Sequence, residues 1–296
     1  MTSIFAVLAI LAAAALVFLL AFWRFADSRR DQTARDELLG LARTDPPARF
    51  DPQMVAGLPE PARRYFRHVI DDGAPLGRAV ELEMRGTIGL GDKADPRYRP
   101  MRARQLLVPP HGLVWQVEAG GLSGSDGITP ATSWTRFWLF RLAPVVHVSG
   151  HDHHRSAFGR LIAEAAFWSP ASLLPGDHVH WAAVDDETAR ATVRFGDQEQ
   201  AVDITVDDDG APRSVRIERW SNANPDGVFR LQPFGGRLSE YRAFDGYRLP
   251  TRVEGGNHFG TDAYFPFYKV EVTRARVITP DQQAAAWARA QPAKAP

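Results

Sequence analysis

Residues 202–217 read VDITVDDDGAPRSVRI, and this stretch predicts the fold class. Val202, Ile204 and Val206 alternate with polar residues, and a second alternation follows the turn. A period of two places the apolar side chains on one face of a half-buried strand. The Asp-Asp-Asp-Gly run between the two halves is typical of a tight turn, so we expect a β-hairpin. A calcium loop also opens with acidic residues, but the alternate spacing and the distal glutamate are missing here.

The same alternation recurs on both sides of this hairpin. We therefore expect roughly ten antiparallel strands with helices only as inserts. The fold class is mainly β (α+β), a large curved antiparallel sheet or half-barrel. The clearest further strands are expected at residues 80–84, 101–108, 113–119, 237–243, 247–254 and 268–277.

Three segments have helical spacing instead. Residues 58–70 begin with proline and glutamate and carry apolar residues on one face. Residues 155–168 form the main helical insert, which Ser169-Pro170 ends. An alanine-rich terminal helix is expected over residues 280–291.

The stretch from Ile4 to Trp23 reads IFAVLAILAAAALVFLLAFW, twenty residues without a charge. About twenty helical residues span a hydrocarbon core of roughly 30 Å, so we expect a membrane-spanning helix. A cleaved signal peptide is the alternative, but it needs a basic start, a shorter apolar run and a small-residue cleavage site. We therefore expect a single-pass protein of the bacterial cytoplasmic (inner) membrane whose partner is the bilayer, through residues 4–23.

The expected organisation has four parts. The anchor, residues 1–25, precedes a solvated juxtamembrane helix and proline-rich linker at residues 26–53. A β-rich globular domain at residues 54–279 follows, and residues 280–296 form the terminal helix and tail. Four arginines directly after the apolar run favour a cytoplasmic globular domain by the positive-inside rule.

Composition and motifs exclude several classes of function. The 35 basic and 35 acidic residues balance, so no global field favours a nucleic-acid partner. The chain has no cysteine, which removes disulfides, thiolate metal sites and a cysteine nucleophile. No nucleophile elbow, P-loop or dinucleotide fingerprint is present, so we expect no cofactor and no recognisable catalytic residue.

Histidines gather between His147 and His154, with Asp152 among them. Imidazole and carboxylate groups are zinc ligands, but this spacing matches no metal motif with known mechanics. We interpret the segment as a polar loop and expect no metal.

Aromatic residues crowd into the first half of the sheet and its insert. Core packing is the simplest interpretation, and an apolar ligand cavity between sheet and insert is the functional alternative. Arg160 and Glu164 lie four residues apart on the insert and can pair, which matters only if they are buried. The candidate ligand-binding residues are Trp115, Trp134, Phe137, Trp138, Phe140, Arg160, Glu164 and Trp168.

Three blocks resemble a bacterial family of uncharacterised proteins of the DUF6544 or DUF6920 type. They are LPEPARRY at 58–65, RLIAEAAFWSPASLLP at 160–175 and YRAFDGYRLPT at 241–251. The resemblance covers most of residues 55–278 and implies no activity. A weaker, fold-level resemblance is to lipoprotein and lipid carriers of the LolA and LppX type, and Phe244 to Pro250 carry it. Such carriers work outside the cytoplasm, which leaves the side of the globular domain open.

Three hypotheses of function follow. The first is a membrane-tethered domain that binds a lipid or other apolar molecule in a half-barrel cavity without covalent chemistry. The second is a structural or interaction module whose protein partner is unknown. The third is a metal-dependent enzyme using residues 147–154.

Overall fold

The computed structural model describes residues 2–42 and 48–279. Within them a single antiparallel sheet dominates, with strand order β6-β5-β4-β3-β2-β1-β13-β12-β11-β10-β9-β8-β7. The prediction of a mainly β protein is confirmed, although the sheet has 13 strands. The strands are β1 (Ala79–Gly89), β2 (Tyr98–Val108), β3 (Gly112–Ala119), β4 (Leu122–Ile128), β5 (Ser133–Leu139), β6 (Ala143–Val148), β7 (Val179–Ala183), β8 (Thr188–Phe195), β9 (Gln198–Val206), β10 (Pro212–Ser221), β11 (Arg230–Phe244), β12 (Tyr247–Asn257) and β13 (Phe265–Ile278).

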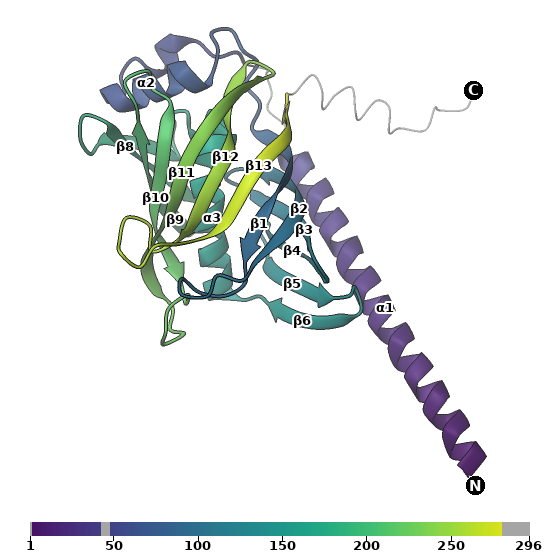
Figure 1. Cartoon of the computed structure of the whole chain (residues 1–296). Helices are drawn as coiled ribbons and strands as arrows, with labels where there is room; N and C mark the ends of the chain where they lie inside the picture. The colour runs from purple at the N-terminus through teal and green to yellow at the C-terminus, as the bar shows by residue number, and fades with distance from the viewer. Residues whose placement is uncertain (1, 43–47, 280–296) are drawn as a thin grey trace, which may run out of the picture.

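Adjacent strands of the sheet are consecutive in the chain, except for β1 and β13, which join its two halves, while the consecutive strands β6 and β7 form its two edges. The sheet curves around one helix, α3, which lies on its concave side (Figure 1). The described helices are α1 (Thr2–Leu41), η1 (Pro52–Val55), α2 (Glu60–Val69), α3 (His151–Trp168) and η2 (Pro170–Leu173).

The strongest local predictions are confirmed. The acidic turn joins β9 to β10, where Gly210 has a φ of +86° and lies against the backbone of Arg64. Only glycine adopts this conformation without strain. The expected helices at 58–70 and 155–168 are α2 and α3, whereas the helix expected at 280–291 lies outside the described residues.

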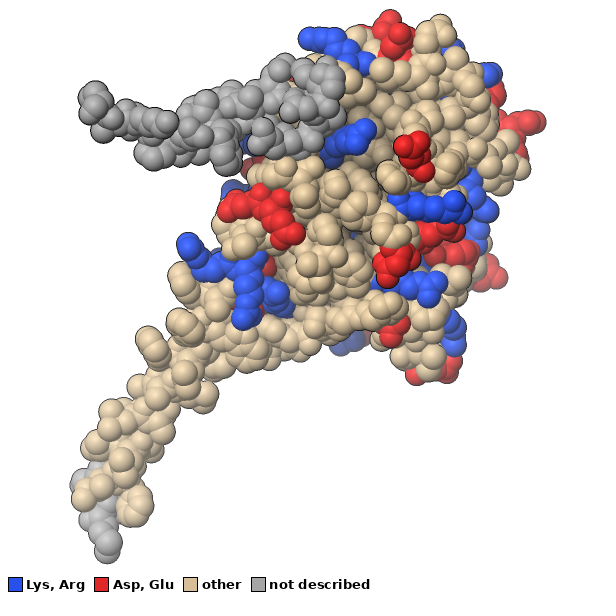
Figure 2. Space-filling model, turned by 180° about the vertical axis from the view of Figure 1, so that it is seen from behind, with Lys and Arg blue, Asp and Glu red and all other residues tan. Residues whose placement is uncertain are grey.

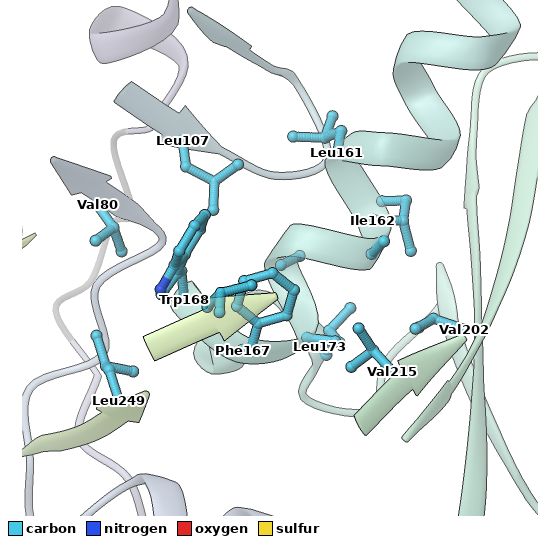
Figure 3. Packing of buried hydrophobic residues seen from close by; sticks show 14 of the residues in the cluster. Val80, Leu107, Leu161, Ile162, Phe167, Trp168, Leu173, Val202, Val215 and Leu249 are labelled. Atoms are coloured by element: carbon cyan, nitrogen blue, oxygen red, sulfur yellow. The ribbon is translucent and has the colours of Figure 1, made fainter. Parts of the chain in front are cut away.

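The main core lies between α3 and the concave face of the sheet. Trp168 of α3 lies beside Leu107 of β2, and Phe167 lies next to Trp168 in the same buried cluster (Figure 3). Burial of such large apolar side chains stabilises the fold by roughly 1.5–3 kcal/mol each. This contact therefore holds α3 against the concave side of the sheet.

A second, smaller core lies on the convex face, where α1 packs. Leu38 is fully buried there among Leu106, Val108 and Trp134. The buried residues of α1 recur every three or four positions, so one face of the helix meets β2 and β3. The expectation of a solvated juxtamembrane helix was wrong, because this segment continues α1 and docks on the domain.

The first half of α1 projects away from the domain. Its apolar side chains are exposed, and the helix is long and apolar enough to cross a membrane. An apolar helix at this position is compatible with either a membrane anchor or a signal sequence. Figure 2 shows no charged side chain along the protruding part and basic side chains where the helix reaches the domain.

Replacing Leu38 by alanine tests the docking of α1. We expect Leu38→Ala to lower the free energy of unfolding by about 2–5 kcal/mol, because it leaves a cavity in a buried contact. Leu41→Ala is the matched control, since Leu41 is 41% exposed on the same helix and should change stability by less than about 0.5 kcal/mol. Urea denaturation of the full chain in detergent measures both. Equal losses for the two variants would show that the contact does not hold the helix to the sheet.

Candidate functional site

A cavity of about 240 Å³ lies between α3 and the concave face of the sheet. Arg160, Ala163, Glu164 and Phe167 of α3 form one wall. Strands β1, β3, β4, β5 and β10 to β13 form the other, mostly with apolar and aromatic side chains. The arrangement is typical of a small-molecule site, with a largely apolar lining and a few polar groups.

The missing side chain at Gly255 contributes to this space. Gly255 pairs with Tyr268 across β12 and β13, and both residues line the cavity. A Cβ added at Gly255 would meet only the carbonyl oxygen of Gly235, at 3.6 Å, within 4 Å. Since that distance is an ordinary contact, a larger side chain would extend into the cavity.

A group of charged side chains forms the polar end of the cavity. Arg160 Nε donates to Glu164 Oε1 at 2.6 Å, and Arg160 also donates to Asp126 of β4. The Arg160 guanidinium lies 5.2 Å from the ring centroid of Trp115. Burial works against the charge of Arg160, but Glu164 and Asp126 outweigh it and raise the pKa of Arg160. The pairing expected from the i, i+4 spacing is therefore present and buried.

The network extends from Asp126 to α3 and β5. Thr135 Oγ1 donates to Asp126 Oδ1 at 2.7 Å and lies 2.8 Å from His153 Nε2. His153 Nδ1 lies 2.8 Å from Ser133 Oγ. Burial lowers the pKa of His153, although the carboxylate of Asp126 opposes this shift. His153 is therefore a neutral bridge between helix and sheet near pH 7.

Glu164 has a second partner on the sheet. Gln105 of β2 donates from Nε2 to Glu164 Oε2. Gln105 is 1% exposed and stands at an inward position of its strand. Buried charges require such hydrogen bonds, so Gln105 stabilises the ionised carboxylate.

Arg219 of β10 is the second cation on the cavity wall. Its Nε donates to the backbone oxygen of Ser156 at 3.1 Å, and its guanidinium lies 4.7 Å from the ring centroid of Phe234. Among the described residues it has no carboxylate within 4 Å. Burial, with the like charge of Arg160 in addition, lowers the pKa of Arg219 to about 10, so it remains cationic at neutral pH.

The structure brings together five of the eight candidate ligand-binding residues. Trp115, Phe137, Arg160, Glu164 and Trp168 all line the cavity. They come from three separate elements, and α3 provides three of them.

Trp134, Trp138 and Phe140 do not line the cavity. The two tryptophans alternate with Phe137 along β5, so they point to the convex face, where Trp134 packs near Leu38 and Trp138 near Trp23. Phe140 lies in the turn after β5 and is 77% exposed. Sequence proximity suggested one aromatic group, but the strand period divides it between two faces and a turn.

The sequence suggested that the histidine segment is a polar loop, but most of it lies in regular secondary structure. His147 belongs to β6, and the segment from His151 onward begins α3. His147 Nε2 lies 3.6 Å from Asp27 of α1, whereas His153 faces the cavity network. The described residues include no group of three or more His, Asp or Glu side chains arranged to hold a metal ion.

Three polar side chains of the cavity and its network were not predicted from the sequence, namely Gln105, Asp126 and Arg219. Two of them could have been found from the alternation of their strands. Gln105 lies on the same strand face as Met101 and Leu107, and Arg219 lies on the same face as Ile217. A polar residue at the inward position of an alternating strand is an informative exception. Asp126 could not have been found in this way, because β4 has no alternation of apolar and polar residues.

The family comparison covers most of the domain that forms this site. Residues 48–270 match the DUF6544 family, a family of unknown function. The chain belongs to the DUF6544 family. The three sequence blocks that suggested it overlap the beginning of α2, the second half of α3 and the β11–β12 turn. No curated protein matches the sequence.

The DUF6544 chain also resembles solved structures of the LolA superfamily. A LolA superfamily protein from Nitrosomonas europaea is 11% identical, with a TM-score of 0.39 over 75% of this chain and 94% of that one. A domain classed with outer-membrane lipoprotein-sorting proteins from Vibrio parahaemolyticus is 10% identical, with a TM-score of 0.36 over 71% and 90%. A DUF1329 family protein from Desulfovibrio piger is 10% identical, with a TM-score of 0.37 over 68% and 86%. TM-scores below 0.5 carry no conclusion about function.

Truncating Glu164 tests the buried ion cluster. We expect Glu164→Ala to lower the free energy of unfolding by about 3–5 kcal/mol, because removal of one partner leaves buried charge uncompensated. Glu187→Ala is the matched control, since Glu187 pairs with Arg213 at the surface and its loss should remove about 0–1 kcal/mol. Urea denaturation distinguishes the two. A loss below about 1 kcal/mol in Glu164→Ala would contradict a buried network.

His153 should make stability depend on pH. Its pKa in the folded protein lies below the ordinary value of 6.5, so the unfolded chain takes up a proton first as pH falls. The stability from neutral His153 is thus present above about pH 6.5 and lost as pH falls through the lowered pKa. As pH falls from about 7.5 to 5.5, we expect the free energy of unfolding of His153→Gln to decrease less than that of the wild type. His180 is exposed, so His180→Gln is the control and should show the same decrease as the wild type. Identical pH slopes in all three would rule out this role.

Proposed function

We propose that this DUF6544 protein is a membrane-tethered binding protein that holds a single-chain lipid or similar apolar molecule in the cavity under α3. The observation that carries the proposal is an apolar cavity whose wall holds an arginine without a carboxylate partner among the described residues. Binding without covalent chemistry requires only this cavity and a polar group that orients the ligand.

The size of the cavity limits the ligand. Its volume of about 240 Å³ is slightly below the range of roughly 300–1,000 Å³ that is usual for drug-sized ligands. A single acyl chain, or part of one, is a better match than a whole phospholipid. The rings of Trp115, Phe137 and Phe167 supply the apolar contacts for such a chain.

The charges favour an anionic head group. Arg160 is neutralised by two carboxylates, but the positive charge of Arg219 meets only a backbone carbonyl and an aromatic ring among the described residues. A carboxylate or phosphate placed on Arg219 would complete its hydrogen bonding. We therefore infer an anionic single-chain amphiphile such as a fatty acid.

The position of the cavity relative to α1 supports a lipid source. The C-terminal end of β1 and the beginning of β13 contribute Ile88 and Phe267 to the cavity. In Figure 1 these strand ends lie on the side of the domain toward which α1 protrudes. A tether of apolar residues would keep this end of the sheet near the bilayer from which an amphiphile is taken up.

Filling the cavity tests the proposal. The full chain in lipid nanodiscs is irradiated with a fatty acid that carries a diazirine in its acyl chain, and mass spectrometry locates the labelled peptides. We expect label on α3 and on β11 to β13, and at least a tenfold loss in Gly255→Leu, which extends into the cavity. Gly57→Leu is the matched control, because a Cβ there meets nothing within 4 Å and Gly57 does not line the cavity.

Replacing the arginine tests the head group. Arg219→Gln should reduce labelling by the acid about tenfold, since a hydrogen bond to a charged group contributes roughly 1.5–3 kcal/mol. Labelling by the matched fatty alcohol, which has no charge, should change little. Label confined to α1, with Gly255→Leu equal to wild type, would overturn the proposal of a binding cavity. Equal effects of Arg219→Gln on acid and alcohol would overturn the anionic head group alone.

A further inference from the structure

The hairpin of β5 and β6 exposes an apolar patch at the edge of the sheet. Phe140 is 77% exposed in its turn, and β6 exposes Val145, Val146 and Val148. We call these four residues the hairpin patch. In the described chain β6 has a partner on one side only. An exposed apolar edge strand invites aggregation in water, so natural proteins usually cover or charge it.

The turn of this hairpin has an unusual sequence. Leu142 N–H donates to Leu139 O at 3.1 Å, and the two central residues have φ of +49° and +59°. Asn-Gly and similar pairs adopt this left-handed conformation most easily, whereas here it contains Phe140 and Arg141. Backbone strain of this kind clusters at functional positions.

The hairpin lies beside the last residue of the apolar run in α1. The Trp23 ring is 5.3 Å from that of Trp138 on β5 and 4.9 Å from that of His147 on β6, centroid to centroid. Figure 1 shows the β5–β6 turn beside the middle of α1. The hairpin therefore lies level with the end of the twenty-residue apolar segment.

Polar contacts hold this arrangement in place. Asp27 and Asp31 of α1 are almost fully buried against the hairpin and its neighbours. Arg136 of β5 lies 3.8 Å from Asp27 and 3.4 Å from Asp31, and Ser125 donates to Asp31 at 2.9 Å. Together with Leu38, these contacts dock α1 at two places along its length, so the hairpin cannot swing away from Trp23.

The apolar segment defines where the bilayer lies. If Ile4 to Trp23 span the hydrocarbon core, Trp23 lies at the interface, where tryptophan is enriched. Whatever contacts Trp23 then also lies at the level of the lipid head groups. Arg29 and Arg30 are exposed further along the same helix, and cations close to a membrane surface are attracted to anionic lipids.

We propose that the β5–β6 hairpin is a second membrane contact, with the hairpin patch inserted into the interfacial region of the bilayer that α1 crosses. The occupant of this surface is lipid. The contact restricts tilting of the domain and so gives it a defined orientation toward the membrane. This inference rests on insertion of α1, which the proposed function shares, and not on the binding cavity.

The absence of cysteine makes a direct test available. The full chain carries one new cysteine at a time, is labelled with an environment-sensitive fluorophore and is reconstituted into phosphatidylcholine–phosphatidylglycerol vesicles. Lipids with a nitroxide on the head group or on the acyl chain then quench labels that are within reach. Circular dichroism checks that each variant is folded.

We expect Phe140→Cys and Val146→Cys labels to be quenched by head-group nitroxides at least about threefold more than a Val184→Cys label. Val184 is the matched control, because it is similarly exposed but lies at the other end of the domain. It is close to Asp186, whose backbone carbonyl accepts a hydrogen bond from Arg64 of α2, and α2 lies away from the protruding part of α1 (Figure 1). An Ile10→Cys label reports insertion of α1 itself and should be quenched from the acyl chain.

Each other outcome overturns the proposal in a recognisable way. Quenching at Ile10→Cys but not at Phe140→Cys or Val146→Cys would mean that the hairpin stays in water. Cross-linking between Val146→Cys chains without lipid quenching would mean that a second copy covers β6. No quenching at Ile10→Cys would remove the bilayer anchor, and with it both this contact and the tether of the proposed function.

Discussion

The contact between α3 and the concave face of the sheet is the constraint on which the rest of this structure depends. Most residues of α3 are buried, including Phe167 and Trp168 at its C-terminal end. Helix α3 contacts strands from both halves of the sheet, from β5 on one side to β9 on the other, and the sheet curves around it. The cavity is the part of this interface that the side chains do not fill, and Gly255 is one reason for the gap.

The same burial explains why the charges form a network. Arg160 and Glu164 lie on the inward side of α3, where an unpaired charge would be strongly unfavourable. The sheet supplies Asp126 and Gln105 from different strands, and these satisfy the two side chains. Arg219 is the exception, because its described contacts are a carbonyl and a ring. A site that recognises an anion needs such an incompletely compensated cation, and this connects the packing of α3 to the proposed ligand.

The convex face connects the domain to the apolar helix. The C-terminal part of β2 is buried on both faces, since Leu106 and Val108 belong to the core at α1 and Leu107 belongs to the core on the concave face. The buried carboxylate of Asp31 is held by Ser125 and Arg136, and burial raises its pKa from the ordinary value. One rigid helix thus carries both the apolar run and a docking face. The direction of the apolar run relative to the sheet therefore follows from the fold rather than from a flexible linker.

Sequence alone determined the local features of this protein. Apolar alternation marked the β9–β10 hairpin, one apolar face marked α2, and twenty uncharged residues marked a segment able to cross a membrane. These features were predictable because each depends on residues close together in the chain. The spacing of Arg160 and Glu164 likewise predicted their pairing.

Only the tertiary structure decided which of these groups meet. The aromatic run of β5 was visible, but its division between the cavity and α1 depends on which elements cover each face of the sheet. Asp126 and Arg219 come together with α3 from strands that are far apart in sequence. The docking of α1 depends on Leu106 and Val108, whose alternation with Leu107 buries one strand on both sides. Contacts of this kind arise from packing between distant segments, and the period of a single strand or helix contains no information about its partner.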